Sequence, residues 1–438
     1  MAKKILLSIS VLICAICAFG QSPVEIRSAG EQKIANGETA ESAKRWALYG
    51  ATRTALLEAS ARLQAFDEVT ALKLTPAQVN AFTMTIVEPQ EQPPQAAAAK
   101  GVVHVDVLAR LDLPAAANRL RRLRKDQEAA NALTETWKEM EELHRQLVEP
   151  AGSKTSQERQ ILLTKLQVKL MAAQVTAALA KTEESLTSAR IPLPDGKARA
   201  KRIAEAAIAT APDFPDAHYA MGDVLTDADD GEPAEAEYRK ALAADSSSAA
   251  GHIKLAGAMR VEGKLPEAVT ELREALRLDP NSVLAHSDLG LILAAQQNNA
   301  DAMTEYHEAI RLDRDWIDAH NNLAIALARQ RRIPEAVIEF REIVRIDPDS
   351  AMGYYNLGIA LADMEKDAES AEALREAVRI NPNHYNAHFD LGELFRLESK
   401  FDEAVKQFKE YLRLAPDNPQ TQRSIKRAKD FIQAHENQ

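Results

Sequence analysis

The octapeptide YNLGIALA at residues 355–362 has two close copies upstream, NNLAIALA at 321–328 and SDLGLILA at 287–294. Each copy begins 34 residues after the one before it. The same period extends without a gap over residues 215–418, which divide into six units. The units begin at Pro215, Ala249, Val283, Ile317, Ala351 and Tyr385. A fixed period of this length predicts a stack of similar supersecondary units.

The residue types at fixed positions predict that each unit is a pair of packed helices. The eighth position is Gly or Ala in every unit, and the twentieth is small: Ala234, Ala268, Ala302, Ala336, Ser370 and Ala404. The twenty-fourth position is bulky: Tyr238, Leu272, Tyr306, Phe340, Leu374 and Phe408. Small residues let two helices approach to about 8–10 Å, and bulky residues fill the space opposite them. A single pair cannot bury its apolar face, so the units must stack.

The flanking sequence defines the ends of the array. Residues 197–214 match the second half of a further unit, with Ala200, Ala204 and Ala207 in phase. Residues 419–438 predict a C-terminal capping helix. Its apolar face would carry Ile425, Ala428 and Ile432, and its polar face Lys426, Arg427 and Lys429.

With this phasing, residues 215–418 resemble the tetratricopeptide repeat (TPR). The resemblance implies a mostly α fold, a right-handed α-solenoid whose concave wall is lined by the first helix of each unit. It also implies that this wall binds peptides or proteins.

The N-terminus predicts a secretory signal peptide over residues 1–20. Lys3 and Lys4 precede an apolar run from Ile5 to Phe19, and cleavage is expected after Gly20. The alternative is an uncleaved anchor, although about 15 apolar residues fall short of the ~20 that span a membrane. Both cysteines, Cys14 and Cys17, lie in this run, so the mature chain would have no disulfide and no thiolate. We therefore expect an exported protein, periplasmic or associated with the cell envelope.

Residues 21–114 predict a small α+β domain. Small or apolar residues at helical spacing (Ala40, Ala43, Ala47, Ala51, Ala55, Leu56 and Ala59) indicate one long helix. The stretches FTMTIVEP at 82–89 and KGVVHVDVLARLDL at 100–113 alternate with a period of two, which predicts a pair of strands. The helix sequence IANGETAESAKRWALYGATRTALLEA and the strand VVHVDVLARLDL resemble the N-terminal domain of flagellar assembly proteins of the T type and of LPP20 lipoproteins. This resemblance implies an exported envelope domain used for assembly contacts.

Residues 115–190 predict two long helices. The first would carry Leu120, Leu123, Ala130, Leu133, Trp137, Met140 and Leu147 on its apolar face. The sequence at 150–152 interrupts it, and Thr155 with Glu158 forms a capping box for the second helix. The two helices could fold as an antiparallel hairpin, or form a coiled coil that makes the protein a homo-oligomer.

The charge distribution disfavours a nucleic-acid partner. The net charge is −11, and residues 191–438 contain 30 Lys and Arg against 44 Asp and Glu. Phosphate binding requires a basic surface. The basic run RLRRLRK at 119–125 is expected to be a solvated helix face, with an anionic partner or lipid surface as the alternative.

Metal binding and catalysis are not expected. Five histidines occupy the fourth position of their units: His218, His252, His286, His320 and His388. Equivalent atoms of neighbouring units lie about 8–10 Å apart, whereas zinc ligands lie ~2 Å from the ion. These rings are therefore expected to pack between helices. The chain has no phosphate-binding glycine loop, zinc-helix motif or nucleophile elbow, so we expect no cofactor and no enzyme activity.

Candidate peptide-binding residues lie on the first helices. Asn offers both a donor and an acceptor to an extended peptide backbone, and this pattern resembles the asparagine ladder of substrate-holding superhelices. The alternative is that Asn before Leu-Gly merely belongs to the repeat pattern. The candidates are Tyr219, Asp223, Lys254, Asp288, Asn321, Asn322, Ile325, Arg329, Tyr355, Asn356, Asp363, Phe389, Asp390 and Arg396.

Three functional hypotheses follow. The first is a non-enzymatic scaffold that binds a peptide segment or partner protein on its concave TPR surface. The second is an assembly subunit of an envelope or secretion complex that self-associates through residues 115–190. The third is an accessory subunit of an envelope enzyme.

Overall fold

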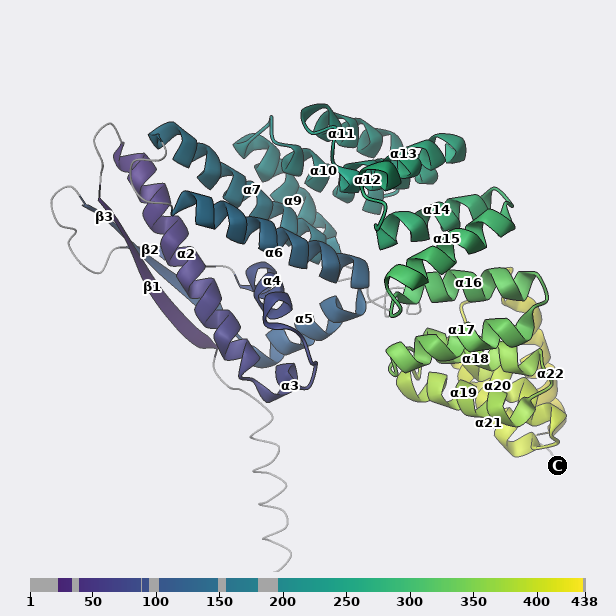
Figure 1. Cartoon of the computed structure of the whole chain (residues 1–438). Helices are drawn as coiled ribbons and strands as arrows, with labels where there is room; N and C mark the ends of the chain where they lie inside the picture. The colour runs from purple at the N-terminus through teal and green to yellow at the C-terminus, as the bar shows by residue number, and fades with distance from the viewer. Residues whose placement is uncertain are drawn as a thin grey trace, which may run out of the picture. The chain divides into compact units, whose positions relative to one another are not determined.

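The computed structural model of the chain describes residues 23–33, 39–87, 89–93, 102–148, 155–179 and 196–435 (Figure 1). The expected signal peptide lies outside these residues. The chain divides into two compact units. The N-terminal unit comprises Met1–Ala180 with Lys197–Ala220, and the C-terminal unit comprises Lys181–Gly196 with Met221–Gln438. Within the described ranges, we find no helix with the length and apolarity needed to cross a bilayer.

A three-stranded antiparallel sheet begins the N-terminal unit. Its strands are β1 (Val24–Lys33), β2 (Gln90–Gln92) and β3 (Val102–Leu111), in the order β1-β3-β2. Ile26 pairs with Ala109, and both are buried. The strand expected over 100–113 is confirmed, and its alternating valines face the core as expected.

One face of this sheet is covered by helix α2 (Ala40–Gln64), as expected from the alanine spacing (Figure 1). The Thr39 side chain caps α2 by accepting a hydrogen bond from the Ser42 amide. Its buried side chains are small, which brings the helix close to the strands. A methyl group on Gly30 of β1 would lie 1.9 Å from the Ala47 carbonyl oxygen, so glycine is required there.

The strand expected over residues 82–89 is wrong. Short helix α3 (Asp67–Thr70) is followed by helix α4 (Pro76–Ile86), which contains most of that stretch. Pro76 occupies the first turn of α4, and Thr75 forms a capping box with Gln78. Phe82 and Met84 alternate with Thr83 and Thr85, which is the pattern of a strand with one exposed face. All four side chains are buried, so the alternation did not mark such a strand. The second long strand of the sheet is β1 instead.

The segment that follows β3 forms helices that complete the same core. Helix α5 (Leu113–Lys125) is separated by Asp126 from α6 (Gln127–Leu147), and α7 (Ser156–Leu179) packs against α6. The Asp126 side chain caps α6, and the expected capping box of Thr155 and Glu158 is present before α7.

The expected hairpin is therefore confirmed in outline, with one break in its first helix. Its apolar residues Leu133, Trp137 and Met140 are buried in the N-terminal core, and α4 packs against both α6 and α7. A coiled coil between two chains would need this same face, so the fold within one chain competes with it. Helix α9 (Gly196–Thr210), the expected half unit, packs Ala207 against Val168 of α7.

The six units each fold as two helices, and the first helix of each begins at the predicted first residue. The pairs are α10 (Pro215–Asp227) and α11 (Gly231–Ala244), α12 (Ala249–Val261) and α13 (Leu265–Leu278), α14 (Val283–Ala295) and α15 (Asn299–Leu312), α16 (Ile317–Arg329) and α17 (Ile333–Ile346), α18 (Ala351–Ala362) and α19 (Asp367–Ile380), and α20 (Tyr385–Leu397) and α21 (Phe401–Leu414). From α12 onward, each second helix packs against its own first helix and the next one.

The small and bulky positions meet as expected. A methyl group on Gly290 of α14 would lie 2.5 Å from the Tyr306 ring of α15, so the ring occupies the space that glycine leaves. The array ends in α22 (Gln422–His435), which buries Ala428 and Ile432 against α20 and α21. The predicted capping helix is therefore present, with Lys426, Arg427 and Lys429 exposed.

Candidate functional site

The first helices of the units lie next to one another. Helix α12 contacts α14, and α14 contacts α16, in addition to the contacts that each makes with second helices. In a curved stack of helical pairs, the layer whose helices contact from unit to unit lies on the inner side of the bend. We use the name inner wall for one surface of the C-terminal half of the chain. It is made by the fifth, sixth and ninth residues of the first helix of each repeat. Most of the predicted peptide-binding residues lie on it and are half-buried.

At its N-terminal end the inner wall holds a neutralised carboxylate. Asp223 of α10 accepts hydrogen bonds from Lys254 Nζ at 2.6 Å and from the Tyr238 hydroxyl at 2.9 Å. These predicted site residues are thus brought together by an ion pair between neighbouring units. Each of the two charges therefore already has a partner of opposite sign within the chain.

The middle of the inner wall places amides beside aliphatic side chains. Asn356 Nδ2 of α18 donates to Asn321 Oδ1 of α16 at 3.3 Å, so the two asparagines meet across adjacent units. The ninth positions of α14, α16 and α18 are Leu291, Ile325 and Ile359. Leu291 is 36% exposed, although it is a large apolar residue. Leu291 was not among the predicted site residues, although it holds the same position in its unit as Ile325 does.

The C-terminal end of the inner wall is aromatic and acidic. The Tyr355 hydroxyl of α18 donates to Asp390 Oδ2 of α20 at 3.0 Å. Burial raises the pKa of Asp390 to about 6, with a further raising effect from Glu393, while the Tyr355 hydrogen bond acts in the opposite direction. Burial beside Asp390 also raises the pKa of Tyr355. Next to Asp390, the Phe389 ring packs against Tyr411 with a centroid separation of 4.9 Å.

Two arginines hold a second carboxylate at this end. Glu393 accepts hydrogen bonds from Arg396 at 3.0 Å and from Arg427 of the capping helix at 2.6 Å. The Arg427 guanidinium also lies over the Phe389 ring, 5.6 Å from its centroid. Arg427 was predicted only as a polar cap residue, although it stands one 34-residue period after Glu393 and so shares its register.

Of the remaining predicted residues, Asp288 and Arg329 both act electrostatically on the Tyr306 hydroxyl, whose pKa burial raises, Arg329 lowers and Asp288 raises. Arg329 and Asp363 are exposed at the C-terminal ends of α16 and α18. Asn322 and Asp288 are half-buried on the inner wall. Tyr219 falls on the part of α10 that belongs to the N-terminal unit.

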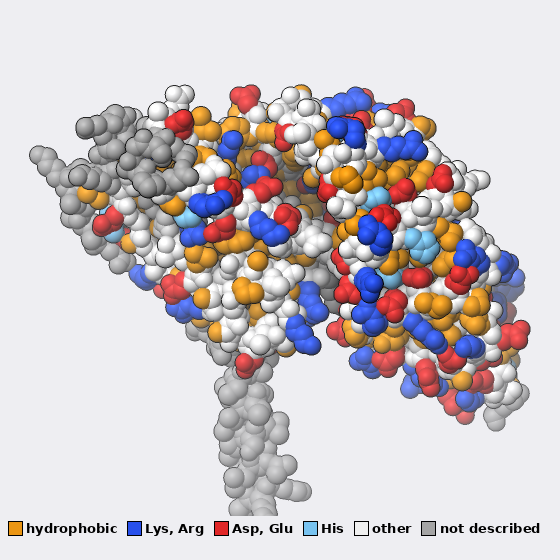
Figure 2. Space-filling view, in the orientation of Figure 1, with side chains coloured by type: hydrophobic (Ala, Val, Ile, Leu, Met, Phe, Trp, Pro, Cys, Tyr) orange, Lys and Arg blue, Asp and Glu red, His pale blue; other side chains and the backbone are white. Residues whose placement is uncertain are grey.

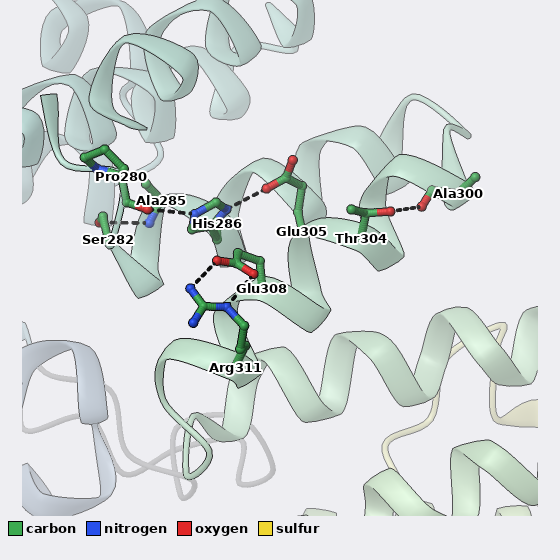
Figure 3. Close-up of polar contacts among 9 residues, drawn as sticks. All are labelled: Pro280, Ser282, Ala285, His286, Ala300, Thr304, Glu305, Glu308 and Arg311. Atoms are coloured by element: carbon green, nitrogen blue, oxygen red, sulfur yellow. Dashed lines mark hydrogen bonds and ion pairs between the residues drawn. The ribbon is translucent and has the colours of Figure 1, made fainter. Parts of the chain in front are cut away.

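The repeated histidines are braces within the solenoid. His286 Nδ1 lies 2.6 Å from Glu305 Oε2 of the second helix, and its Nε2 lies 3.2 Å from the Pro280 carbonyl oxygen of the preceding turn (Figure 3). His252 and His320 make the same pair of contacts, with Glu271 and Glu339 as carboxylates. Figure 2 shows histidines grouped on one face of the repeat region beside acidic and basic side chains. The expectation that these rings pack between helices is confirmed, although the carboxylate partners were not foreseen.

The braces vary in the last two units. In the sixth unit, the partner of His388 is the side-chain amide of Gln407 and not a carboxylate. Gln407 Oε1 lies 2.7 Å from His388 Nδ1. Tyr354 takes the fourth position of the fifth unit. Within the described residues, no group of three His, Cys, Asp or Glu is arranged to hold a metal ion.

Comparison with known proteins identifies the repeats. A family model described as tetratricopeptide repeat matches residues 317–351 and 355–419, and another described as TPR repeat matches residues 260–297 and 290–331. No curated protein matches this chain. The C-terminal part of the chain therefore carries tetratricopeptide repeats, and the expected fold class, a mostly α protein with a TPR solenoid, is confirmed.

Several solved structures are similar to parts of this chain. YrrB, described as a TPR protein with an unusual peptide-binding site, is 26% identical, with 42% of this chain and 95% of that chain covered and a TM-score of 0.33. MamA of Desulfovibrio magneticus RS-1 is 22% identical, with coverages of 39% and 97% and a TM-score of 0.36. PilF of Pseudomonas aeruginosa is 21% identical, with coverages of 50% and 94% and a TM-score of 0.40.

Proposed function

We propose that this protein is a non-enzymatic interaction scaffold whose TPR inner wall holds an extended peptide segment of a partner protein. One observation carries the proposal. Three successive first helices, α14, α16 and α18, present aliphatic side chains at the ninth position beside Asp or Asn at the sixth. A polar row next to an apolar row is the arrangement that an extended peptide can use along its whole length.

The two rows match the two kinds of group that a peptide presents. Asn side chains can accept from backbone N–H groups and donate to backbone carbonyls. Alternate side chains of an extended peptide point to opposite sides, so one set can contact Leu291, Ile325 and Ile359 while the other faces solvent. Neighbouring first helices about 10 Å apart correspond to about three extended residues at ~3.3 Å each. The peptide backbone would therefore reach a new unit every three residues.

We also propose that the protein acts in the cell envelope after export. The signal peptide predicted at residues 1–20 supports this location. In that setting the N-terminal unit would make assembly contacts while the repeats hold the partner.

A peptide library tests the binding proposal. Full-length protein is used to select 12-residue peptides from a random displayed library, and the affinity of the best peptide is measured by fluorescence anisotropy. We expect the double variant Asn321→Ala, Asn356→Ala to weaken binding by roughly tenfold, because two hydrogen bonds contribute about 0.5–1.5 kcal/mol each.

A matched control uses the outer helices. Thr270 and Thr304 lie on second helices, where each hydroxyl bonds to the carbonyl four residues earlier. The double variant Thr270→Ala, Thr304→Ala should bind the peptide as wild type does. Equal losses in both double variants, or no loss in the asparagine variant, would remove the inner wall from the proposal.

A photo-crosslinking experiment locates the bound peptide independently. The crosslinker p-benzoylphenylalanine replaces either Ile325 on the inner wall or Ile338 on the second helix α17. The Ile338 side chain is 58% exposed. We expect the selected peptide to be captured at position 325 and not at position 338. Capture at position 338 alone would place the binding surface on the other side of the solenoid.

A further inference from the structure

The chain treats two inner-wall aspartates differently. Asp223 is paired with the ammonium of Lys254 at 2.6 Å and also accepts from a tyrosine hydroxyl. Asp390, at the other end of the wall, is also half-buried, but its hydrogen bond comes from the neutral Tyr355 hydroxyl at 3.0 Å. Among the described residues, no Lys, Arg or His forms an ion pair with Asp390. One carboxylate is thus neutralised by the chain and the other is not.

The groups around Asp390 do not balance its charge. Tyr355 faces it from α18, Tyr385 and Glu393 share its helix, and Tyr411 approaches from α21. Arg396 and Arg427, the cations of this region, both direct their guanidinium groups to Glu393. The surroundings of Asp390 are therefore aromatic, neutral or acidic.

We propose that Asp390 receives a cationic side chain, Lys or Arg, from the peptide segment that the inner wall binds. This inference rests on the proposed function and specifies its partner: an extended segment with aliphatic residues and a basic residue toward the end held by the sixth unit. A partly desolvated carboxylate without a counter-ion is costly, and an incoming ammonium or guanidinium removes that cost. An acidic residue at the same place would meet the Asp390 carboxylate with no cation between them, so acidic segments are disfavoured there.

The arrangement also makes binding dependent on pH. The cationic group binds the ionised form of Asp390, whose pKa burial raises to about 6. Affinity for a basic peptide therefore increases as the pH rises through this value and falls when Asp390 is protonated.

The test is a comparison of peptide selection by wild type and Asp390→Asn. The probe is the random 12-residue library used above, selected against each full-length protein at pH 7.5. We expect Lys and Arg to be enriched several-fold at one position of the peptides selected by wild type, and this enrichment to disappear with Asp390→Asn. Glu372→Gln, which removes an exposed carboxylate from the second helix α19, is the control and should retain the enrichment.

The affinity of one selected peptide gives a second measurement. Replacing its basic residue by norleucine should weaken binding to wild type by roughly tenfold and leave binding to Asp390→Asn unchanged. Between pH 7.5 and 5.0 the affinity of the basic peptide for wild type should fall, and that for Asp390→Asn should stay level. Tyr355→Phe keeps the carboxylate and should keep the basic preference, which covers the case in which Asp390→Asn fails to fold.

The outcomes separate this inference from the proposed function. If peptides bind and Asn321→Ala, Asn356→Ala weakens them, but no basic preference depends on Asp390, the inference is wrong and the proposed function stands. If no selected peptide responds to any inner-wall variant, both are wrong.

Discussion

The imidazole of His320 is held between two acceptors: its Nδ1 lies 2.6 Å from Glu339 Oε2, and its Nε2 lies 3.0 Å from the Arg314 carbonyl oxygen. A carboxylate and a carbonyl only accept hydrogen bonds. An imidazole that donates to both carries a proton on each nitrogen, so these two contacts favour the positively charged form. This charged brace joins the turn before α16 to both helices of the fourth unit.

The brace predicts that the contribution of His320 to stability is larger at mildly acidic than at alkaline pH. Burial lowers the pKa of His320, but the hydrogen bonds to Glu339 and to the Arg314 carbonyl outweigh it, and the pKa is raised. A group whose pKa is higher in the folded state stabilises fully below its unfolded value, near 6.5, and loses this effect as the pH rises through the folded value. We expect the difference in free energy of unfolding between wild type and His320→Gln to be larger at pH 5.5 than at pH 9, measured by urea denaturation.

Exposed His307 of α15 provides the control for this measurement. His307→Gln should leave the pH dependence of the unfolding midpoint as in wild type. A His320→Gln variant with the same pH dependence as wild type would show that the brace is not charged in the folded protein.

The close approach of paired helices predicts opposite effects for two glycine substitutions. At Gly290, a new methyl group would meet the Tyr306 ring at 2.5 Å and the Ala302 carbonyl oxygen at 3.0 Å. Gly290→Ala should therefore destabilise the protein by about 1–3 kcal/mol. At Gly257 of α12, a methyl group would meet no heavy atom of the described residues within 4 Å, so Gly257→Ala should stabilise by roughly 0.5–1 kcal/mol. Thermal unfolding followed by circular dichroism measures both, and the same sign for both variants would contradict this packing.

The repeats could be predicted from sequence because the same packing requirement recurs in all six of them. In each repeat, a small residue lets the two helices approach and a bulky residue fills the space opposite. Each copy supports the others, so even Ser370, the exception among the alanines, stays in phase; its hydroxyl donates to the Gly358 carbonyl of the paired helix at 2.7 Å. Residues 76–86 occur once and are apolar on several sides, and the alternation at 82–85 misled because alternation indicates a strand only when one face is exposed.

The sequence predicts which residues face the candidate site, but it does not predict which of their side chains contact one another. The fifth and sixth positions identified Asn321, Asn356 and Asp390, because a first helix must turn the same face inward in every unit. Arg427 stands one 34-residue period after Glu393, but the repeat pattern did not predict that the two side chains would pair. It also could not distinguish Asp223, which has a lysine partner, from Asp390, which does not, because side-chain reach between units decides this.

The capping box of α4 predicts local destabilisation when its threonine is removed. Thr75 accepts from the Gln78 amide, and the Thr75 amide donates to the Gln78 side chain. Thr75→Ala should cost about 1 kcal/mol, seen by hydrogen exchange as faster exchange of the amides at 78–80. Thr136→Ala on α6, whose hydroxyl only bonds to the carbonyl of Ala132, should leave these amides unchanged. Unchanged exchange in Thr75→Ala would mean that tertiary packing alone holds the start of α4.

The capping helix predicts that damage at the C-terminus weakens the array unit by unit. Ile432 of α22 is 9% exposed and shares a cluster with Phe408 and Tyr411 of the sixth unit. Ile432→Ala removes contacts from the sixth unit and so lowers its stability. In a stack held by nearest-neighbour interfaces, a distant unit loses stability only if the units between it and the change do. Hydrogen exchange should therefore increase most in α20 and α21 and be unchanged in α12 and α13, with Lys429→Ala, on the exposed face, as the control. An equal increase in every unit would show that the six units unfold as one block, and that the inner wall is a single cooperative surface.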